Sequence, residues 1–425
     1  MNAIPIMLVA LLAAASADAA LWVRGKTDKS PLSYEVGDEI VFTLKLEGLE
    51  GGESLPEGVS FAWIRTGDDG VTEKGSWNAV EPLIVKTTLK RAGFLRLFAE
   101  ARKADGKPWK PAGAKAALAF DGGAAAGVKT LRQSKPEPAD FDAFWRRCRD
   151  ELAAVPVKGV REEIPSPTAG VKLYKVSVDC PGTPNRTTGY LSIPDKPGKF
   201  AATAGFFGYG ASWSLRAASA PKTLPKGTMR FWVSAHGFEL GRDKAYYDGL
   251  RKKAGSGKYG HGFDPVQNAK PETCYFHGMA LRVMRAVEYL KSCPEWNGKN
   301  LTVSGGSQAS LQSMWCAAFV PGVTEAKISV PWLCNVGGPT DGRNYGTWYP
   351  QWAPGLDYFD QVNVAKRVPK TCRVEITRIG LGDYTAPPCG AAIMYGALQC
   401  PKSATWVQGS THGYVPPEPE KILWK

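Results

Sequence analysis

The stretch Leu301-Thr-Val-Ser-Gly-Gly-Ser-Gln-Ala-Ser310 carries the strongest indication of fold class in the 425-residue sequence. A short β-prone segment runs into two glycines, and the residues from Gln308 to Phe319 then favour a helix. This context is typical of a nucleophile elbow, in which Ser307 sits on a sharp strand-to-helix turn with its hydroxyl exposed. The pattern G-x-S-x-G is met except at its last position, where Ala309 replaces glycine. A phosphate-binding glycine loop is the alternative, but no lysine follows the glycines, which excludes a P-loop.

A serine at neutral pH is a weak nucleophile and needs a neighbouring base. The sequence offers four histidines, which are His236, His261, His277 and His412. His412 lies in a glycine-flanked loop just after an apolar segment at 404–407. Asp383 follows a strand candidate and lies between Ser307 and His412, which is the order of nucleophile, acid and base in α/β-hydrolases. We therefore predict Ser307 as nucleophile, His412 as general base and Asp383 as the group that orients it; a structural loop histidine is the alternative for His412.

A tetrahedral intermediate also needs two donors for its oxyanion. The backbone N–H that follows the nucleophile, that of Gln308, is the first candidate. The second is expected in the loop after an earlier strand, where Phe206-Phe-Gly-Tyr209 places the Tyr209 N–H. The alternative is that Gly208 only makes a turn.

Strands and helices alternate through residues 131–425, which predicts an α/β domain with a mostly parallel sheet and helices on both faces. Asp140 is expected to cap a helix that buries Phe141, Phe144 and Trp145. The strongest helix is expected at 276–293. The strand candidates are 172–178, 201–207, 230–235, 301–304, 326–330 and 374–379.

The N-terminal part has a different character. In residues 21–121, Ile40, Phe42 and Leu44 alternate with more polar positions, and 95–101 repeats that period of two. The pattern predicts an immunoglobulin-like β-sandwich, joined to the α/β domain by a glycine- and alanine-rich linker at 122–130. Residues 1–20 indicate a signal peptide, with an apolar core and Ala17-Asp-Ala19 as the cleavage pattern. We therefore expect a secreted or periplasmic protein, and the apolar stretch is too short for a membrane span.

Composition excludes several classes of function. The net charge of +13 comes from scattered lysines and arginines rather than a basic arm, and no zinc-finger or RNA-binding pattern accompanies it, so no nucleic-acid partner is expected. None of the nine cysteines is spaced as CxxC, and no His, Cys and carboxylate cluster has ligand spacing, so neither a metal nor another cofactor is expected. The cysteines either pair in an exported protein or are buried thiols.

In combination, these motifs resemble the acetyl xylan esterase / cephalosporin C deacetylase family of α/β-hydrolases. The resemblance implies the same roles for Ser307, His412 and Asp383, and main-chain oxyanion donors at Tyr209 and Gln308. It is carried by Phe141-Asp-Ala-Phe-Trp145, Gly208-Tyr209, Gly305-Gly-Ser-Gln308, Tyr358-Phe-Asp-Gln-Val-Asn-Val-Ala365 and Gly380-Leu-Gly-Asp383.

The sequence departs from that family's pattern at four places, which leaves the acyl group and the alcohol open. Phe207 stands where the family usually has histidine, and Ala235-His-Gly237 replaces an Arg-Gly-Gln motif. Gly413 replaces the glutamate that usually follows the catalytic histidine, and Ala309 replaces the last glycine of the elbow.

The function predicted from the sequence is that of an exported serine carboxylesterase that removes acetyl groups from polysaccharides or oligosaccharides such as acetylated xylan. Trp332, Trp348 and Trp352 cluster between the elbow and the acid and would form a sugar-stacking wall, or else a lid packed on the core. The alternatives are a methyl esterase acting on acidic sugars, a peptidase, or a non-catalytic carbohydrate-binding protein.

Overall fold

The computed structural model describes residues 21–49, 55–209 and 221–425. The expected signal peptide, residues 1–20, lies outside the described residues and stays a prediction. None of the described helices is long and apolar enough to cross a membrane.

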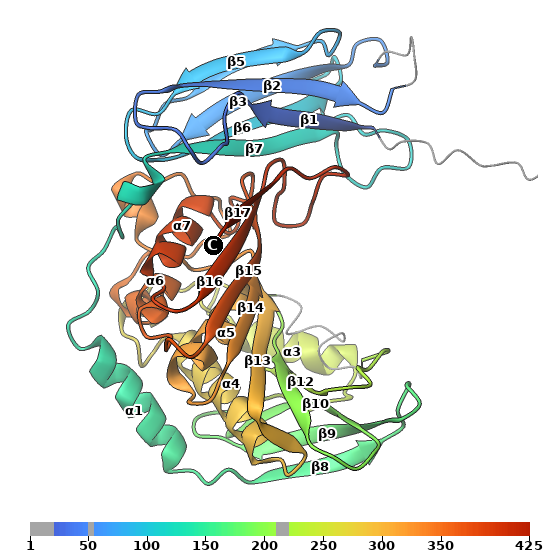
Figure 1. Ribbon diagram of the computed structural model, residues 1–425, viewed down its shortest axis with the longest axis vertical. Coiled ribbons are helices and arrows are strands. Elements are labelled where there is room, and N and C mark those ends of the chain that lie inside the picture. Colours follow the sequence, from blue (N-terminus) through green and yellow to red (C-terminus); the bar gives the residue numbers. More distant parts are fainter. Residues whose placement is uncertain (1–20, 50–54, 210–220) are drawn as a thin grey trace, which may run out of the picture.

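The N-terminal strands form two antiparallel sheets that face each other across one core (Figure 1). One sheet has the order β1-β2-β5 and the other β4-β3-β6-β7, an arrangement like that of immunoglobulin domains, in which strands A, B and E pair in one sheet and C, F and G in the other. Ile40, Phe42 and Leu44 are fully buried in the core. We call residues 22–126 the N-terminal sandwich. Its strands are β1 (Trp22–Thr27), β2 (Glu39–Glu47), β3 (Ser60–Gly67), β4 (Glu73–Trp77), β5 (Leu83–Thr88), β6 (Gly93–Arg102) and β7 (Ala119–Ala126).

The prediction of a linker at 122–130 is wrong in its first half. Residues 119–126 form β7, which pairs with β6 along its whole length, and only the short turn η1 (Val128–Thr130) follows. Glycine and alanine have little intrinsic preference for strands, so the composition of this segment is typical of a loop. The reason for the small residues is steric, because a side chain at Gly123 would lie 2.3 Å from the Leu95 carbonyl oxygen and 3.0 Å from that of Leu381.

The α/β part contains a ten-stranded sheet with the order β17-β16-β15-β14-β13-β11-β12-β10-β9-β8. The pairings from β12 to β16 are parallel, while β8, β9, β10 and β17 pair antiparallel. Each of the six strand candidates overlaps one of these strands. The strands are β8 (Gly159–Ile164), β9 (Val171–Asp179), β10 (Arg186–Pro194), β11 (Phe200–Gly205), β12 (Met229–Ser234), β13 (Trp296–Gly306), β14 (Glu325–Ser329), β15 (Arg373–Gly380), β16 (Lys402–Val407) and β17 (Lys421–Trp424).

Helices cover the sheet, and their apolar faces build its core. The predicted helices at 276–293 and 308–319 are present as α4 and α5, which contact β11, β13 and β14. Asp140 occupies the N-cap position of α1, but its carboxylate accepts no cap hydrogen bond and instead accepts from the Tyr358 hydroxyl. The described helices are α1 (Phe141–Ala153), α3 (Lys244–Ala254), α4 (Tyr275–Ser292), α5 (Gln308–Phe319), α6 (Gln361–Ala365) and α7 (Pro388–Ala397), with short turns η3 (Gln267–Ala269), η4 (Gly338–Asp341) and η5 (Pro354–Tyr358).

The sheet brings the predicted chemical groups to one edge. Tyr209, Ser307, Asp383 and His412 follow β11, β13, β15 and β16, all of which run in the same direction. In open α/β sheets the crevice at the carboxyl ends of the strands is where ligands bind. The four groups therefore come from the edge at which a site is expected.

Candidate active site

Ser307 lies on a strained turn between β13 and α5. Its backbone has φ 60° and ψ −127°, a combination that costs a non-glycine residue about 1–3 kcal/mol and that clusters at functional sites. Both preceding glycines are sterically required: a Cβ at Gly305 would lie 2.4 Å from that of Ala309, and one at Gly306 would lie 2.6 Å from the Ser329 hydroxyl oxygen. The Ser307 N–H donates to the Ser329 carbonyl at 3.1 Å. This is the geometry of a nucleophile elbow.

Asp383 and His412 form a hydrogen-bonded pair. His412 Nδ1 lies 2.9 Å from Asp383 Oδ2, and the other carboxylate oxygen accepts from the N–H groups of Thr385 and Ala386 at 3.1 and 2.9 Å. The Asp383 side chain is 1% exposed, whereas that of His412 is 31% exposed. A buried carboxylate that is fixed by backbone donors holds the imidazole in the tautomer with its proton on Nδ1, which leaves Nε2 free to accept a proton.

Two further contacts hold the loop that carries His412. Arg378, on β15, donates from Nη2 to the His412 carbonyl at 2.9 Å, and the Gly382 N–H donates to the Ser410 carbonyl at 3.0 Å. The loops after β15 and β16 are thereby tied together. Nothing in the sequence around Arg378 indicates this role, because it depends on the arginine side chain extending from β15 to the loop that follows the neighbouring strand β16.

The loop after β11 lies against the elbow. A Cβ at Gly208 would lie 3.3 Å from the Gly306 carbonyl oxygen and 3.7 Å from Ser307 Cβ, so glycine allows a close approach here. Gln312, one turn into α5, donates from Nε2 to the Phe207 carbonyl at 3.0 Å. The loop with Tyr209 is therefore fixed beside Ser307, where a second oxyanion donor is needed.

A cavity of about 250 Å³ opens over the elbow. Trp332 is buried and donates from its indole to the Trp348 carbonyl at 2.9 Å, while Trp348 is 57% exposed. Sequence reasoning missed Phe263 and Thr385. The cavity is lined by Tyr209, Phe263, Ser307, Trp332, Trp348, Thr385 and His412.

Trp352 lies elsewhere, which corrects its prediction as a substrate-binding residue. It is not among the residues that line this cavity. Its indole nitrogen donates to Asp357 at 3.0 Å, and Lys135 lies 4.5 Å from the ring centroid. Of the three predicted tryptophans, Trp332 and Trp348 therefore line the cavity, whereas Trp352 packs against Asp357 and Lys135.

A second, larger cavity of about 680 Å³ adjoins the first and shares Tyr209 and Trp348 with it. Arg251 and Lys252 line it from the last turn of α3. Among the described residues of its lining the one carboxylate is Asp248, which is paired with Lys244. The space beside the elbow therefore combines aromatic rings with positive charge.

The other histidines are placed differently from His412. His261 stacks on the Tyr209 ring at 4.2 Å, and burial lowers the pKa of His261 to about 4. His236 Nδ1 lies 2.9 Å from the Tyr275 hydroxyl, and burial also lowers the pKa of His236, with His261 adding to the effect. Both of these rings are therefore neutral at neutral pH. The Nε2 of His277 instead lies 3.5 Å from a carboxylate oxygen of Glu151. Of the four, His412 is the one that lines the cavity with Ser307.

None of the described residues that line the cavity at Ser307 is a cysteine. All nine cysteines are free and buried, so of the two alternatives left open by the sequence the structure has buried thiols. No group of three His, Cys, Asp or Glu side chains in residues 21–49, 55–209 and 221–425 could hold a metal ion.

A family comparison now bears on this geometry. The model of the acetyl xylan esterase (AXE1) family matches residues 125–338, half of the chain, including the elbow and the Tyr209 loop. The chain belongs to the acetyl xylan esterase family. The predicted resemblance is thereby confirmed, and the family is one of carbohydrate esterases within the serine carboxylic ester hydrolases.

Individual relatives of this acetyl xylan esterase family member agree with the assignment. Acetyl esterase Axe7A of Xylanibacter ruminicola is 27% identical over 288 residues, which cover 64% of this chain and 63% of that protein; the chain thus spans less than two thirds of that relative. The solved acetyl xylan esterases from Paenibacillus sp. R4 and Thermoanaerobacterium sp. JW/SL YS485 are each 20% identical, with TM-scores of 0.54 and 0.55. Each covers 68% of this chain, and the match spans 94% and 93% of those structures, respectively. Their likeness confirms the predicted α/β-hydrolase fold.

Proposed function

We propose that this chain is a serine esterase that removes acetyl groups from polysaccharides or their oligosaccharides by a Ser307–His412–Asp383 acyl-enzyme mechanism. The observation that carries the proposal is that His412, which lines the same cavity as Ser307 on its strained turn, is paired behind that cavity lining with the buried Asp383. Family membership and the name of the acetyl esterase relative support the reaction class.

In the first half-reaction, Ser307 Oγ attacks the ester carbonyl carbon while His412 Nε2 takes the hydroxyl proton. The negative charge that develops on the carbonyl oxygen is stabilised by the N–H groups of Tyr209 and Gln308. The carbon–oxygen bond to the sugar then breaks, and His412 returns the proton to the departing hydroxyl. In the second half-reaction water attacks the acyl-Ser307 in the same way and acetate leaves.

The size of the cavities supports a small acyl group on a large alcohol. The space at Ser307 is about 250 Å³ and is lined mainly by aromatic side chains, while the adjoining space is about 680 Å³. An acetyl group suits the first, and the exposed ring of Trp348 at the boundary suits stacking on a sugar.

The cations of the larger cavity favour a polysaccharide that carries acidic sugars, and they also favour a second candidate function. Arg251 lines this cavity together with Tyr209 and His261. Burial raises the pKa of Tyr209 and lowers that of His261 to about 4; the charge of Arg251 partly offsets the first shift and adds to the second. A uronic acid beside the acetylated sugar would meet this charge. The second candidate is an esterase that cleaves a methyl ester of such an acidic sugar.

The test is the release of acetate and of methanol from acetylated glucuronoxylan and from methyl-esterified uronic-acid polymers. Acetate as the main product supports the first candidate and methanol the second. The Ser307→Ala variant must release neither; if it retains activity, the assignment of the nucleophile is wrong.

The acidic-sugar preference has its own variants. We expect Arg251→Gln/Lys252→Gln to raise KM for glucuronoxylan by about 10-fold, since two charge contacts are lost, and to leave kcat/KM for p-nitrophenyl acetate unchanged. The matched control is Lys299→Gln, an exposed lysine near the opposite end of β13. An unchanged KM in the double variant would remove the acidic-sugar preference and leave the esterase proposal standing.

We also propose that the protein is exported, from the apolar composition of residues 1–20. The test is to express the full sequence and to determine the N-terminus of the protein in the medium or periplasm. A processed N-terminus near Ala19 is expected, and an unprocessed protein that stays in the cytoplasm would refute export.

A further inference from the structure

Both loops that carry the His412–Asp383 pair rest on the N-terminal sandwich. Gln408, four residues before His412, donates from Nε2 to the Gly123 carbonyl at 2.8 Å and accepts from the Gly123 N–H at 3.0 Å. A Cβ at Gly122 would lie 2.3 Å from Gln408 Oε1. Because Gly122 and Gly123 have no side chains, the amide of Gln408, on the loop that carries His412, can form the two main-chain hydrogen bonds of Gly123 that a neighbouring β-strand would otherwise form.

The acid loop makes an equally close contact. A Cβ at Gly382, the residue before Asp383, would lie 1.9 Å from the Asp121 carbonyl oxygen, so the backbones of the two segments touch. The Asp121 carboxylate accepts two hydrogen bonds from Arg96, at 2.7 and 2.6 Å, and the Arg96 guanidinium lies 4.9 Å from the centre of the Tyr384 ring. The residues on both sides of Asp383 therefore contact the sandwich.

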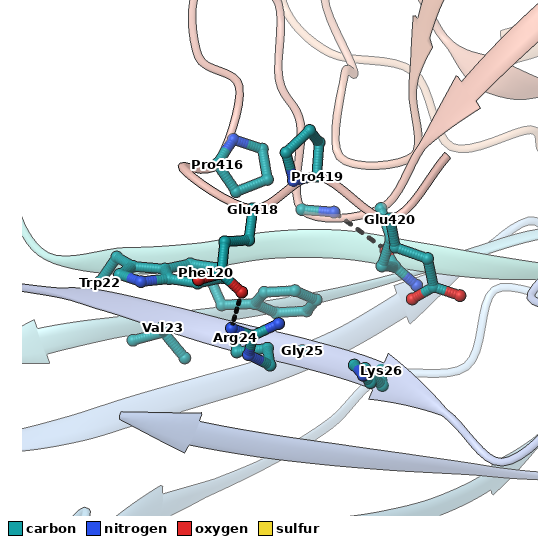
Figure 2. A pocket seen from close by; sticks show the side chains of 12 residues that line it. Trp22, Val23, Arg24, Gly25, Lys26, Phe120, Pro416, Glu418, Pro419 and Glu420 are labelled. Carbon is teal, nitrogen blue, oxygen red and sulfur yellow. Dashed lines mark hydrogen bonds and ion pairs between the residues drawn. The ribbon is translucent and has the colours of Figure 1, made fainter. Parts of the chain in front are cut away.

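The outer rim of the same contact is shown in Figure 2, which views a cavity of about 340 Å³ between the sandwich and the loop at 408–420. Arg24 of β1 forms an ion pair with Glu418, and the Phe120 ring lies beside them in the lining of the cavity. The Gln408 N–H donates to the Glu420 carbonyl at 3.1 Å, which closes the base of the loop. The sandwich thus holds the loop at two points, at Gln408 and at Glu418, on either side of His412.

We propose that the N-terminal sandwich is a positioning domain for the catalytic pair. Its positioning residues are Arg96 and Asp121, and Gln408 of the loop that carries His412 is the positioning residue on the other side of the contact. The inference rests on the proposed Ser307–His412–Asp383 mechanism. None of the three side chains lines the cavity at Ser307; they act through the loops that they hold. Since a displacement of about 1 Å in a catalytic group can cost about 10²-fold in rate, support of this kind sets kcat rather than substrate binding.

The Arg96–Asp121 pair also keeps the surroundings of Asp383 electrically balanced. Burial raises the pKa of Asp121, and the nearby charge of Asp383 adds a smaller increase. For Arg96, burial lowers the pKa, but the hydrogen bond to Asp121 and the charges of Asp121, Tyr384 and Asp383 together raise it above its usual value. The other charged or titratable groups around the two loops are His412, Tyr384 against the Arg96 guanidinium, Arg378 on the His412 carbonyl, Arg24 and Glu418 at the outer rim, and Asp68 and Arg343 at the neighbouring sandwich contact. A change at Asp121 alone leaves all of these in place.

A charge-restoring pair of variants tests the proposal with a readout that a purely structural role would not move. Asp121→Asn leaves the charge of Arg96 uncompensated near Asp383, the partner of His412. This disfavours the protonated imidazole, so the acidic limb of the pH profile of kcat/KM for p-nitrophenyl acetate should move about half a pH unit lower. Adding Arg96→Gln restores neutrality, and the limb should return to its wild-type position. The matched control is Arg102→Gln, which breaks a pair with Glu100 on the same strand β6 and should move nothing.

A second variant tests the mechanical contact. Gln408→Met keeps the side-chain volume but removes both hydrogen bonds to Gly123, and we expect kcat to fall about 10-fold while KM stays within about 2-fold. All variants are first compared with wild type by thermal unfolding and circular dichroism. Unchanged pH profiles and kcat in folded Asp121→Asn and Gln408→Met would overturn the positioning role. If the wild type itself fails to hydrolyse p-nitrophenyl acetate or to react with a fluorophosphonate probe, the proposed function fails instead, and the two failures are distinguishable.

Discussion

Replacement of Asp383 by asparagine should reverse the tautomer of His412. In the structure Oδ1 accepts from two backbone N–H groups, those of Thr385 and Ala386, and Oδ2 faces His412 Nδ1 at 2.9 Å. The amide nitrogen of an asparagine cannot accept from those N–H groups, so its oxygen must take the Oδ1 position and its NH2 the Oδ2 position. The NH2 then donates to Nδ1, and the imidazole proton moves to Nε2, the nitrogen that accepts the proton of Ser307 in the proposed mechanism.

The expected magnitude follows from that geometry. Loss of the base should lower kcat by about 10⁴-fold, the size of effect that the same substitution has in serine-protease triads, which corresponds to about 5.5 kcal/mol of activation free energy. The free energy of unfolding should fall by only about 1–3 kcal/mol, because a charge-assisted hydrogen bond becomes a neutral one. Residual activity should rise about 10-fold per pH unit in alkaline solution, since hydroxide then takes the place of the missing base.

The assay is steady-state hydrolysis of p-nitrophenyl acetate across pH, with thermal unfolding measured on the same samples. Asp360→Asn is the matched control, because Asp360 is also buried and accepts from three backbone N–H groups but contacts no histidine. It should lower stability and leave the pH dependence of kcat unchanged. A kcat for Asp383→Asn within about 10-fold of wild type, with the wild-type pH profile, would refute the triad.

Three further outcomes are expected. Burial raises the pKa of Asp357 from 3.8 to about 7. The folded protein therefore favours the neutral carboxyl group, and this contribution to the free energy of unfolding, complete below pH 4, is lost as the pH rises through 7. Since asparagine stays neutral, Asp357→Asn should stabilise the protein by at most about 4 kcal/mol at pH 8.5 and by nothing near pH 4, as measured by denaturant unfolding. Gln312→Leu frees the Phe207 carbonyl and should lower kcat about 10-fold with little change in KM, because the oxyanion loop loses its support. A thiol reagent should find no rapidly reacting cysteine in the native protein and nine in guanidinium chloride without reductant; a smaller number after denaturation would reveal a disulfide.

The elbow could be predicted to the residue because its causes are local. A β-prone segment, two glycines, a serine and a helix-favouring segment lie within a few positions of one another, and the helix observed, Gln308–Phe319, has the predicted bounds. Asp383 and His412 could be named because so few histidines compete and because the order of the three groups along the chain restricts the choice.

The residues that support the site could not be named in the same way. Arg378 and Gln312 act across the space between elements, on the carbonyls of His412 and Phe207, and no local pattern distinguishes them from other surface-compatible polar residues. Trp348 and Trp352 are close in sequence, which predicts one aromatic cluster, but only Trp348 lines the cavity.

Glycine explains both what the sequence reveals and what it hides. At Gly305 the missing Cβ makes room for the methyl group of Ala309. The space between these two positions holds one methyl group but not two, so a glycine and an alanine suffice where the motif usually has two glycines. The replacement at Ala309 therefore does not disturb the elbow. At Gly123 and Gly382 the missing Cβ makes room for a backbone that is remote in sequence. In the sequence, small residues that are required by such a contact look like those of a linker. They can be recognised as part of an interface only in the structure, where the contacting backbone is seen. The missing side chain of glycine therefore makes the proposed nucleophile Ser307 predictable from the sequence. At the contact between the N-terminal sandwich and the loops of Asp383 and His412, it makes the interface unpredictable from the sequence.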